Sequence, residues 1–503
     1  MIISDITTQV NFSEFLDTFK NKLKNIFNDE NNIREISLNR GFPKNILHDI
    51  MENSPLSVAI PKEYGGRGVI VKEILGMVDA ASYESLPLSL TFGINYGLFL
   101  EPVAKYAQET VKKEIFDRFL TQQNMGGLMI TEPDHGSDAL NMQTSNVKVG
   151  SDFHIKGIKH WQGLTGMADY WLMTSRHKCE NGILARDIDF FICDVHQSNQ
   201  AIYVEEYYNN LGLYLIPYGK NIVDIQVPEK FKLVPESTGL KLIMDLLHRS
   251  RFQFPGMGMG FIRRILDDAI KHCSKRFISG KALMELDQVQ FQISRIQSAF
   301  TICSAMCLRS VGYSSIDNNL AGSAVEANSM KAYVSDLMQE SAQTLTQLLG
   351  ADGYKAESLG STGIIDSRPF QIFEGSNEML YTQISEMVLK LMHRQNIMNL
   401  YDFFMTYELT KNVADQFKST LNFTVDVNIH QRKSVDLGKI ISRVVSANHV
   451  FELGIKGFRK ELVKASLETI KHDIASLVAS YKTTTKVLQI EDYKDSGDWM
   501  SFC

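Results

Sequence analysis

Three absences in this sequence each exclude a class of protein. No stretch approaches the run of about eighteen apolar residues that a membrane-spanning helix needs, so we expect a soluble globular protein. Neither sign of charge dominates, because 52 lysines and arginines stand against 58 aspartates and glutamates, a net charge of -6. A chain of this balance has no basic surface for a polyanion. We therefore expect no nucleic-acid partner.

Cysteine is also scarce, with six residues in a chain of 503. The only close pair, Cys303 and Cys307, fits one face of a helix better than a redox or zinc motif. The scattered cysteines therefore predict free thiols. His135 and His160 show no metal-ligand spacing, so we also predict no metal site. Residues 1–27 lack the apolar core of a secretory signal, which favours a cytoplasmic protein.

The period of the apolar residues changes twice along the chain. Helical spacing comes first, apart from a loop that proline and paired glycines force at 59–66. Short, largely alternating segments at 153–156, 187–192 and 222–227 then predict strands. Helical spacing returns after this region. A chain of this length suggests two to four domains.

Two apolar stripes mark the C-terminal half. One predicts a buried helix face and consists of Ile262, Ile265, Leu266, Ala269 and Ile270. The other alternates steps of four and three, as on a helix packed lengthwise against a neighbour, and consists of Val463, Leu467, Ile470, Ile474, Leu477 and Tyr481. The run GMGMG at 256–260 has no preceding strand, so it indicates close helix packing and not a dinucleotide loop.

We therefore predict a mainly α-helical fold with a central β domain. Its four parts are an N-terminal helical domain (1–120), a middle β domain (121–236), a C-terminal helical bundle (237–395) and a helical extension (396–503).

The segment 130–138, with the sequence ITEPDHGSD, is the first to indicate chemistry. Thr131, at the end of a predicted strand, can point its hydroxyl at the polar edge of a ligand ring. Gly136 and Ser137 can bring a backbone amide and a hydroxyl to a diphosphate, because glycine permits close approach. A solvated surface turn is the alternative. The segment resembles the T-E-P-x-x-G-S-D signature of acyl-CoA dehydrogenases, whose fold is a helical domain, a middle β-barrel and a four-helix bundle in that order.

Three further segments resemble family motifs, in the family order. Trp161, in the run KHW, corresponds to a tryptophan that covers the flavin and excludes water from a ring that must accept a hydride. Arg276, in RFISGK, corresponds to an arginine that pairs with the FAD diphosphate of a neighbouring subunit. Gln347 and Ala351, in QLLGADG, correspond to a segment that holds the adenosine half across the dimer interface. Ser279 and Ala351 depart from the phenylalanine and glycine of the family.

The run FQIFEGSNE at 370–378 contains Glu374, in a strand-like apolar setting, at the position of the family's catalytic base. Desaturation of a thioester requires removal of an α-proton and transfer of a β-hydride. Burial beside flavin and acyl chain would raise the pKa of a glutamate above about 4.3, which suits a base for a carbon acid. An exposed helix-capping acid is the alternative. By resemblance the Glu374 amide helps to hold the thioester carbonyl, Arg251 lies near the base and Ser376 contacts the adenosine side.

The resemblance implies an enzyme of lipid metabolism that uses FAD for α,β-dehydrogenation of an acyl-CoA, or of an acyl carrier protein thioester, to the trans-2-enoyl thioester. By family, an electron-transfer flavoprotein takes the electrons, and the protein is a homodimer or homotetramer. The implied cofactor-binding residues are Ile130, Thr131, Gly136, Ser137, Trp161, Gly163, Arg276, Gln347, Ala351, Ser376 and Glu378. The implied substrate-binding residues are Arg251 and Glu374. The extension resembles that of very-long-chain dehydrogenases, which use it for dimer packing and membrane-surface attachment.

Three departures from the family pattern keep other functions open. Gly163 stands where the family usually has a hydroxyl near flavin N5; acyl-CoA oxidases also tend to have glycine there, and a missing side chain could open a path for oxygen. The segment 365–368 lacks an arginine of the usual motif, and no carrier-recognition segment is visible near 213–215. The alternatives are therefore an oxidase or flavin monooxygenase that uses O2, or a catalytically silent acyl- or FAD-binding subunit.

Overall fold

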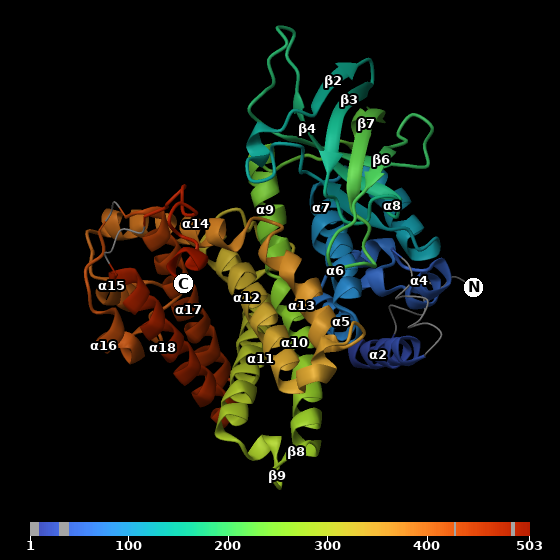
Figure 1. The fold of residues 1–503 in the computed structure, drawn as a ribbon. Helices are drawn as coiled ribbons and strands as arrows, with labels where there is room; N and C mark the ends of the chain where they lie inside the picture. The colour runs from blue at the N-terminus through green and yellow to red at the C-terminus, as the bar shows by residue number, and fades with distance from the viewer. Residues whose placement is uncertain (1–9, 30–39, 427–428, 484–487) are drawn as a thin grey trace.

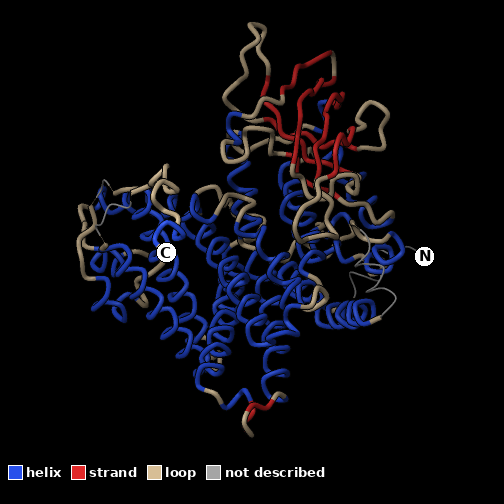
Figure 2. Tube along the Cα trace, viewed as in Figure 1, coloured by secondary structure: helices blue, strands red, loops and turns tan. Residues whose placement is uncertain are grey.

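The computed structural model describes residues 10–29, 40–426, 429–483 and 488–503. In that part of the chain, helices come first, then a β sheet, then a helical bundle and a further group of helices (Figure 1). Figure 2 shows most of the strands gathered at one end of the molecule and a short strand pair at the opposite end, with helices making up most of the rest. The predicted fold class, mainly α-helical with a central β domain, is confirmed.

The N-terminal helices are interrupted at the loop that the sequence predicts. Within 59–66 lies a single turn of 3-10 helix, Lys62–Tyr64, which ends at Gly65 with a φ of 86°. A π-helical turn, Tyr96–Leu100, joins α6 to α7. The bounds are α2 (Phe12–Asn28), α4 (Lys44–Met51), α5 (Val71–Glu84), α6 (Leu86–Asn95), α7 (Glu101–Tyr106) and α8 (Glu109–Thr121).

Strands β1 to β7 form one curled sheet. The bounds are β1 (Gly126–Met129), β2 (Ser145–Val149), β3 (Asp152–His160), β4 (Tyr170–His177), β5 (Asp189–Asp194), β6 (Tyr203–Tyr207) and β7 (Gly219–Pro228). Their order is β1-β4-β2-β3-β7-β6, with β5 paired to β4.

The predicted strand segments lie in β3, β5 and β7, with two shifts in their bounds. β5 begins at Asp189, because Asp187 accepts hydrogen bonds from backbone amides at the start of the next helix, which begins at Gly239. β1 ends at Met129, so Thr131 lies two residues beyond the strand end where the sequence placed it. There its carbonyl oxygen accepts from the amide of His160, 3.0 Å away.

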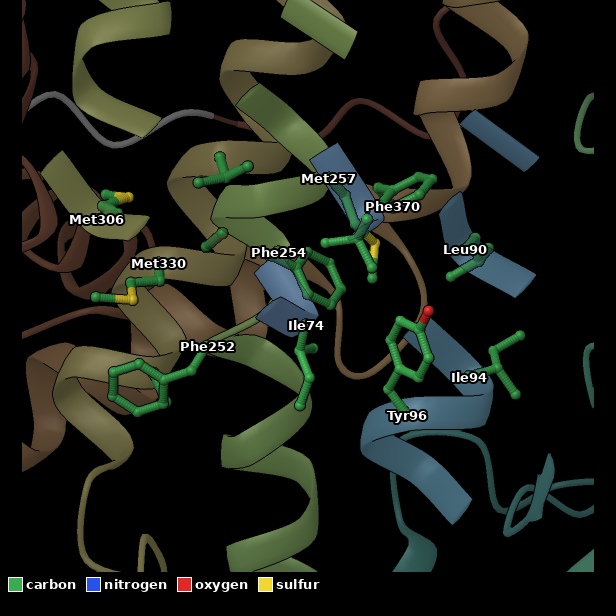
Figure 3. Close-up of a cluster of buried hydrophobic side chains, with 14 of the residues drawn as sticks. Ile74, Leu90, Ile94, Tyr96, Phe252, Phe254, Met257, Met306, Met330 and Phe370 are labelled. Carbon is green, nitrogen blue, oxygen red and sulfur yellow. The ribbon is translucent and has the colours of Figure 1, made fainter. Parts of the chain in front are cut away.

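The bundle is centred on a long helix that packs against α5 and two of its neighbours. The bounds are α9 (Gly239–Arg251), α10 (Phe254–Lys275), α11 (Asp287–Tyr313), α12 (Ala324–Leu349), α13 (Leu359–Ser367) and α14 (Asn377–Gln395), with a small hairpin of β8 (Phe277–Ile278) and β9 (Lys281–Ala282). α10 is the central helix and contacts α5, α11 and α12. Figure 3 shows the apolar core at this junction, where Tyr96, Phe254 and Met257 lie together.

Glycines permit close helix contacts around α10, as the sequence predicts. A Cβ atom at Gly256 would lie 2.8 Å from the side chain of Val78, and one at Gly260 would overlap the backbone of α5. On the other side, a Cβ at Gly93 would overlap Met257, and one at Gly97 would lie 3.2 Å from the Cα atom of a residue in α9. The run at 256–260 is therefore a packing surface.

The buried stripe of α10 is confirmed in part. Ile262, Ile265 and Ala269 are buried and Leu266 is half-buried, but Ile270 is exposed. The prediction for Ile270 is wrong because α5 ends beside an earlier turn of α10, at the ion pair between Glu84 and Arg264, and does not cover the last turns.

The extension packs along the bundle on the side away from the N-terminal helices (Figure 1). Its bounds are α15 (Leu400–Thr406), α16 (Lys418–Leu421), α17 (Gln431–Ile455) and α18 (Lys460–Lys482). α17 contacts α11, α12 and α14, and α18 contacts α11 and α17. The predicted seam on α18 is confirmed, because Ile470, Ile474 and Tyr481 are buried and the other members pack beside them.

None of the helices in the described ranges combines the length and the apolar character that crossing a bilayer requires. Cys303 and Cys307 lie on one helix, α11, and all six cysteines are free.

Candidate active site

A cavity of about 360 Å³ lies where the β sheet meets α6 and α9. Apolar side chains of α6 and α9 form much of its wall, and segments near 130–137 and 161–163 line its β-domain side. The predicted site residues that line it are Ile130, Thr131, Gly136, Ser137, Trp161, Gly163, Arg251 and Glu374. The fold thus brings together residues from the motifs of the β domain and of the bundle.

Glu374 lies in a tight turn, and the strand-like setting expected from the sequence is wrong. The turn at 372–376 leads from a short 3-10 helix, Arg368–Gln371, into α14. Glu374 has a φ of 52° and Gly375 a φ of 92°, so two consecutive residues are left-handed. For a residue with a side chain this conformation costs about 1–3 kcal/mol, and its surroundings must hold it.

Two buried cations hold the carbonyl oxygens of this turn. Arg251 Nη2 donates to the carbonyl oxygen of Glu374 at 2.7 Å, and Lys331 Nζ donates to that of Gly375 at 2.8 Å. The side chain of Arg251 is fixed in turn, because its Nη1 donates to Oδ1 of Asn328 at 2.5 Å. Both cations are buried, so these charge-assisted bonds are shielded from water.

The carboxylate of Glu374 has one occupied and one free oxygen. Its Oε1 accepts a hydrogen bond from Ser250 Oγ at 2.9 Å. Its Oε2 is buried and has no hydrogen-bond partner among the residues that the structure describes. Burial raises the pKa of Glu374 above its ordinary value, and this effect outweighs the opposing influence of Arg251 and Lys331. The free oxygen is therefore that of a base strengthened by its surroundings, at the edge of the cavity.

Lys331 is a second unusual titratable group beside the turn. Its Nζ also donates to Oδ1 of Asn377, 3.0 Å away, and its side chain is fully buried on α12. Burial lowers the pKa of Lys331 to about 7, although the charge of Glu374 acts in the opposite direction. The proton of this lysine is thus loosely held near neutral pH.

On the β-domain side, a buried ion pair fixes the segment that carries Thr131. Lys159 Nζ lies 2.8 Å from Glu132 Oε1, and burial lowers the pKa of Lys159 to about 8. Glu132 also accepts from the amide of Thr144 at 3.0 Å. The carbonyl oxygen of Thr131 accepts from Gln162 Nε2 at 3.0 Å. The motif's glutamate is therefore structural, and it anchors the loop that carries Gly136 and Ser137.

Trp161 and Gly163 form the rim of the cavity beside β3. Trp161 is 51% exposed, and the centroid of its ring lies 4.5 Å from that of Tyr208. A Cβ atom at Gly163 would lie 2.9 Å from Ile94 and 3.3 Å from Ile216. The side chains of Ile94 and Ile216 therefore occupy much of the space that a side chain at position 163 would take.

A second group of predicted residues lies far from the cavity. Arg276 Nη1 donates to the carbonyl oxygen of Leu349 at 3.4 Å, which places it beside Gln347 and Ala351. All three predicted residues are exposed. Arg251 precedes α10 and Arg276 follows it, and its 22 residues span about 33 Å. One chain alone therefore does not bring this group to the cavity.

Ser376 and Glu378 belong to the start of α14. Ser376 Oγ accepts from the amide of Met379 at 3.4 Å and caps the helix, and Glu378 is exposed in its first turn. The structure does not place either side chain among those that line the cavity.

Sequence reasoning missed Ser250, Asn328 and Lys331. A signal existed for Lys331, because it stands on α12 among buried positions such as Ala327 and Val334, where helical spacing predicts an apolar residue. Such a lysine is buried and needs a local partner. No comparable signal marks Ser250.

Comparisons with known proteins point to one family. The N-terminal, middle and C-terminal domains of acyl-CoA dehydrogenase match residues 13–123, 127–223 and 237–389. The chain is 23% identical to an acyl-CoA dehydrogenase of Bacillus subtilis, over 69% of this chain and 90% of that protein. It is 25% identical to the subunit CarC of a caffeyl-CoA reductase–Etf complex of Acetobacterium woodii, over 71% and 92%. The fold is similar to an acyl-CoA dehydrogenase complexed with FAD from Bacillus anthracis, with a TM-score of 0.74, 17% identity, and coverage of 93% of this chain and 87% of that one.

Proposed function

This chain belongs to the acyl-CoA dehydrogenase family, and we propose that it oxidises the Cα–Cβ bond of an acyl-CoA thioester with FAD as its cofactor. The product is the trans-2-enoyl thioester. The observation that carries the proposal is the free, buried Oε2 atom of Glu374 at the edge of a largely apolar cavity.

The residues on the β-domain side fit a flavin. Thr131 and Ser137 offer hydroxyl groups, and no atom lies within 4 Å of a Cβ built at Gly136, so a diphosphate can approach the backbone there. Trp161 presents half of its ring at the rim, where a flat ring system can stack. When bound, FAD accepts the hydride that leaves the β-carbon. We assign Ile130 and Gly163 to the same contact surface and Ser376 and Glu378 to the adenosine side.

Glu374 is the base in this proposal. Its Oε2 accepts the α-proton, while the bond from Ser250 to Oε1 fixes the orientation of the carboxylate. Because burial favours the neutral form of Glu374, the site gains stability as the proton arrives. The backbone amide of Glu374 supports the thioester carbonyl, and Arg251 keeps that amide in place through the carbonyl oxygen of the same residue.

The acyl chain lies between α6 and α9. Leu90, Ile94 and Leu98 line one side of the cavity, and Met244 and Leu247 line the other. Apolar walls favour an acyl chain over a polar substrate. We propose coenzyme A as the thiol carrier, as in the names of the relatives.

An electron-transfer flavoprotein is the proposed acceptor of the electrons. The similarity to a subunit of an Etf-containing complex supports it. Several relatives are named as acyl-CoA dehydrogenases, which favours a dehydrogenase over the oxidase and monooxygenase alternatives. Arg276, Gln347 and Ala351 are assigned to the FAD of a partner subunit, since they lie together on an exposed surface at the far end of α10.

The test is Glu374→Gln, with Glu386→Gln on the exposed face of α14 as the matched control. The yellow Glu374→Gln protein must keep FAD and lose anaerobic bleaching by acyl-CoA. The control must bleach like the wild type. Unchanged bleaching in Glu374→Gln would remove the base from the proposal. Turnover of any acyl-CoA by the wild type would exclude a catalytically silent subunit.

A further inference from the structure

Arg443 on α17 reaches from the C-terminal extension into the bundle. Its Nη1 donates to Tyr381 Oη at 2.9 Å, and its Nη2 lies 3.7 Å from Asp336 Oδ2. Its guanidinium carbon lies 4.1 Å from the centre of the Tyr333 ring. α17 comes this close because Gly438 has no side chain, and a Cβ atom there would overlap the carbonyl group of Tyr381. At this point the extension is part of the bundle's interior.

Asp336 on α12 links that arginine to the turn that carries Glu374. Its Oδ1 accepts from Asn377 Nδ2 at 2.7 Å and from Gln371 Nε2 at 2.8 Å, and its Oδ2 accepts from Tyr381 Oη at 2.6 Å. Gln371 and Asn377 are the residues that flank the turn at 372–376. One carboxylate therefore ties both ends of the turn to the same point on α12.

Lys331 continues this path to the turn itself, through its bonds to Asn377 and to the carbonyl oxygen of Gly375. The formal charges alternate in sign along Arg443, Asp336, Lys331 and Glu374. Alternation matters in a buried setting, because an uncompensated charge there is costly. Other charged groups also face the path. Arg251 from α9 and Glu378 from α14 lie near Lys331. Lys439 of α17 lies over the Tyr381 ring, and Arg368 Nη1 donates to Gln371 Oε1 at 2.5 Å. Beside Tyr333 stand Arg295, Glu340 and Asp473.

We propose that the extension supplies Arg443 as a positioning residue for the active site. Arg443 compensates the charge of Asp336, which holds Gln371 and Asn377 and, with them, the left-handed Glu374. The inference rests on the proposed role of Glu374 as the base. It gives the extension a part in catalysis that requires neither a membrane nor a partner protein.

The test is Arg443→Met, which keeps most of the side-chain volume and removes the charge. We expect the rate of anaerobic bleaching to fall by about tenfold or more, because a displaced reacting group is slow. We also expect the acid limb of the rate against pH to move to higher pH, since an uncompensated Asp336 disfavours ionised Glu374. Arg443→Lys restores the charge and should recover most of both properties.

His449→Gln is the matched control. His449 lies on the same helix, and its Nε2 is 3.3 Å from Oε1 of Glu326 on α12, but the structure shows no link from this pair to the turn at 372–376. The His449→Gln variant removes a buried polar contact at the same interface between α17 and α12. We expect it to leave the bleaching rate and its pH dependence unchanged, even where it lowers the thermal stability.

A second readout does not depend on turnover. Backbone hydrogen exchange in peptides that cover 369–378 should become faster in Arg443→Met and stay unchanged in His449→Gln. Where Arg443→Met does not fold, Asp336→Asn removes the opposite charge with almost no change of shape, and the same acceleration is expected. Wild-type bleaching and wild-type exchange in a folded variant would overturn the proposal. If none of the acyl-CoAs tested bleaches the wild type, the proposed function is refuted. The hydrogen-exchange result would still decide whether Arg443 positions the turn.

Discussion

The Nζ atom of Lys331 lies 2.8 Å from the carbonyl oxygen of Gly375, so a buried cation holds the residue that follows the proposed base. Arg251 holds the carbonyl oxygen of Glu374 in the same way. Two left-handed residues in succession are thus each fixed by a separate charge. The geometry of the base depends on electrostatics as much as on packing.

Lys331→Met tests this dependence. We expect the rate of anaerobic flavin bleaching to fall by about a hundredfold while FAD is retained, because the turn loses one of its two restraints. In the wild type the pKa of Lys331 is about 7, so its charge is present below that pH and is lost above it. The wild-type rate should therefore decline on the alkaline side, and the variant should lack this limb. An unchanged alkaline limb in the variant would contradict the assignment.

Gly163→Ser tests how tightly the flavin side of the cavity is packed. A serine side chain would press on Ile94 and Ile216, so we expect a lower FAD content after purification and a lower thermal stability. Shortening the neighbour in the double variant Gly163→Ser/Ile94→Val should recover FAD.

Stopped-flow mixing of reduced wild-type enzyme with air should show slow reoxidation of the flavin, and fast reoxidation would favour an oxidase.

Arg276→Ala tests whether one subunit completes the FAD site of another. Alone, we expect this variant to lose FAD, and Glu374→Gln alone to lose bleaching. When the two variants are unfolded and refolded together in equal amounts, about half of the dimers are mixed. Each mixed dimer has one complete site of two, so bleaching should return to roughly a quarter of the wild-type level. A mixture as inactive as its parents would show that Arg276 acts within its own chain. Arg394→Ala, on the exposed end of α14, provides the control.

Asp366→Asn tests the attachment of the β domain to the bundle. Asp366 Oδ1 accepts from the amide of Leu213 at 2.6 Å, and burial raises the pKa of Asp366 to about 7. In the folded state the Asp366 carboxyl keeps its proton up to about pH 7, whereas in the unfolded state it loses the proton near pH 4. The free energy of unfolding therefore falls as the pH rises from about 4 to about 7. Asparagine keeps the acceptor and cannot ionise. Its melting temperature should match the wild type near pH 4 and exceed it by about 2 °C or more at pH 8. A difference independent of pH would contradict this reading.

The order of the helical and β regions could be predicted from the sequence, and the run that carries the proposed base could be located in it, because both depend on local patterns. Apolar spacing changes from helical to alternating and back, and Glu374 lies in a short run with a distinctive order of residues. The same locality explains the error about its conformation. The apolar neighbours of Glu374 predict a strand, whereas the turn is imposed by cations from α9 and α12 that are remote in sequence.

The rest of the site depends on contacts that no local pattern encodes. Ser250 is one serine among many until the fold sets it 2.9 Å from the carboxylate of Glu374. Gly163 suggested an opening, because the sequence does not show that Ile94 reaches into that space from α6. The role that we propose for the extension could not be predicted for the same reason, since only the fold places Arg443 beside Asp336.

The glycines that face α9 and α10 set the distance between the two walls of the acyl cleft. Leu90, Ile94 and Leu98 reach into the cleft from α6 and the turn that follows it, while Gly93 and Gly97 on the same segment touch the opposite helices. A larger residue at Gly97 would press on the backbone of α9 at Ser250, and one at Gly93 would displace the end of the Met257 side chain. The width available to a branched acyl chain is therefore governed by positions that never meet the substrate, and selectivity could be changed there without altering a single lining side chain.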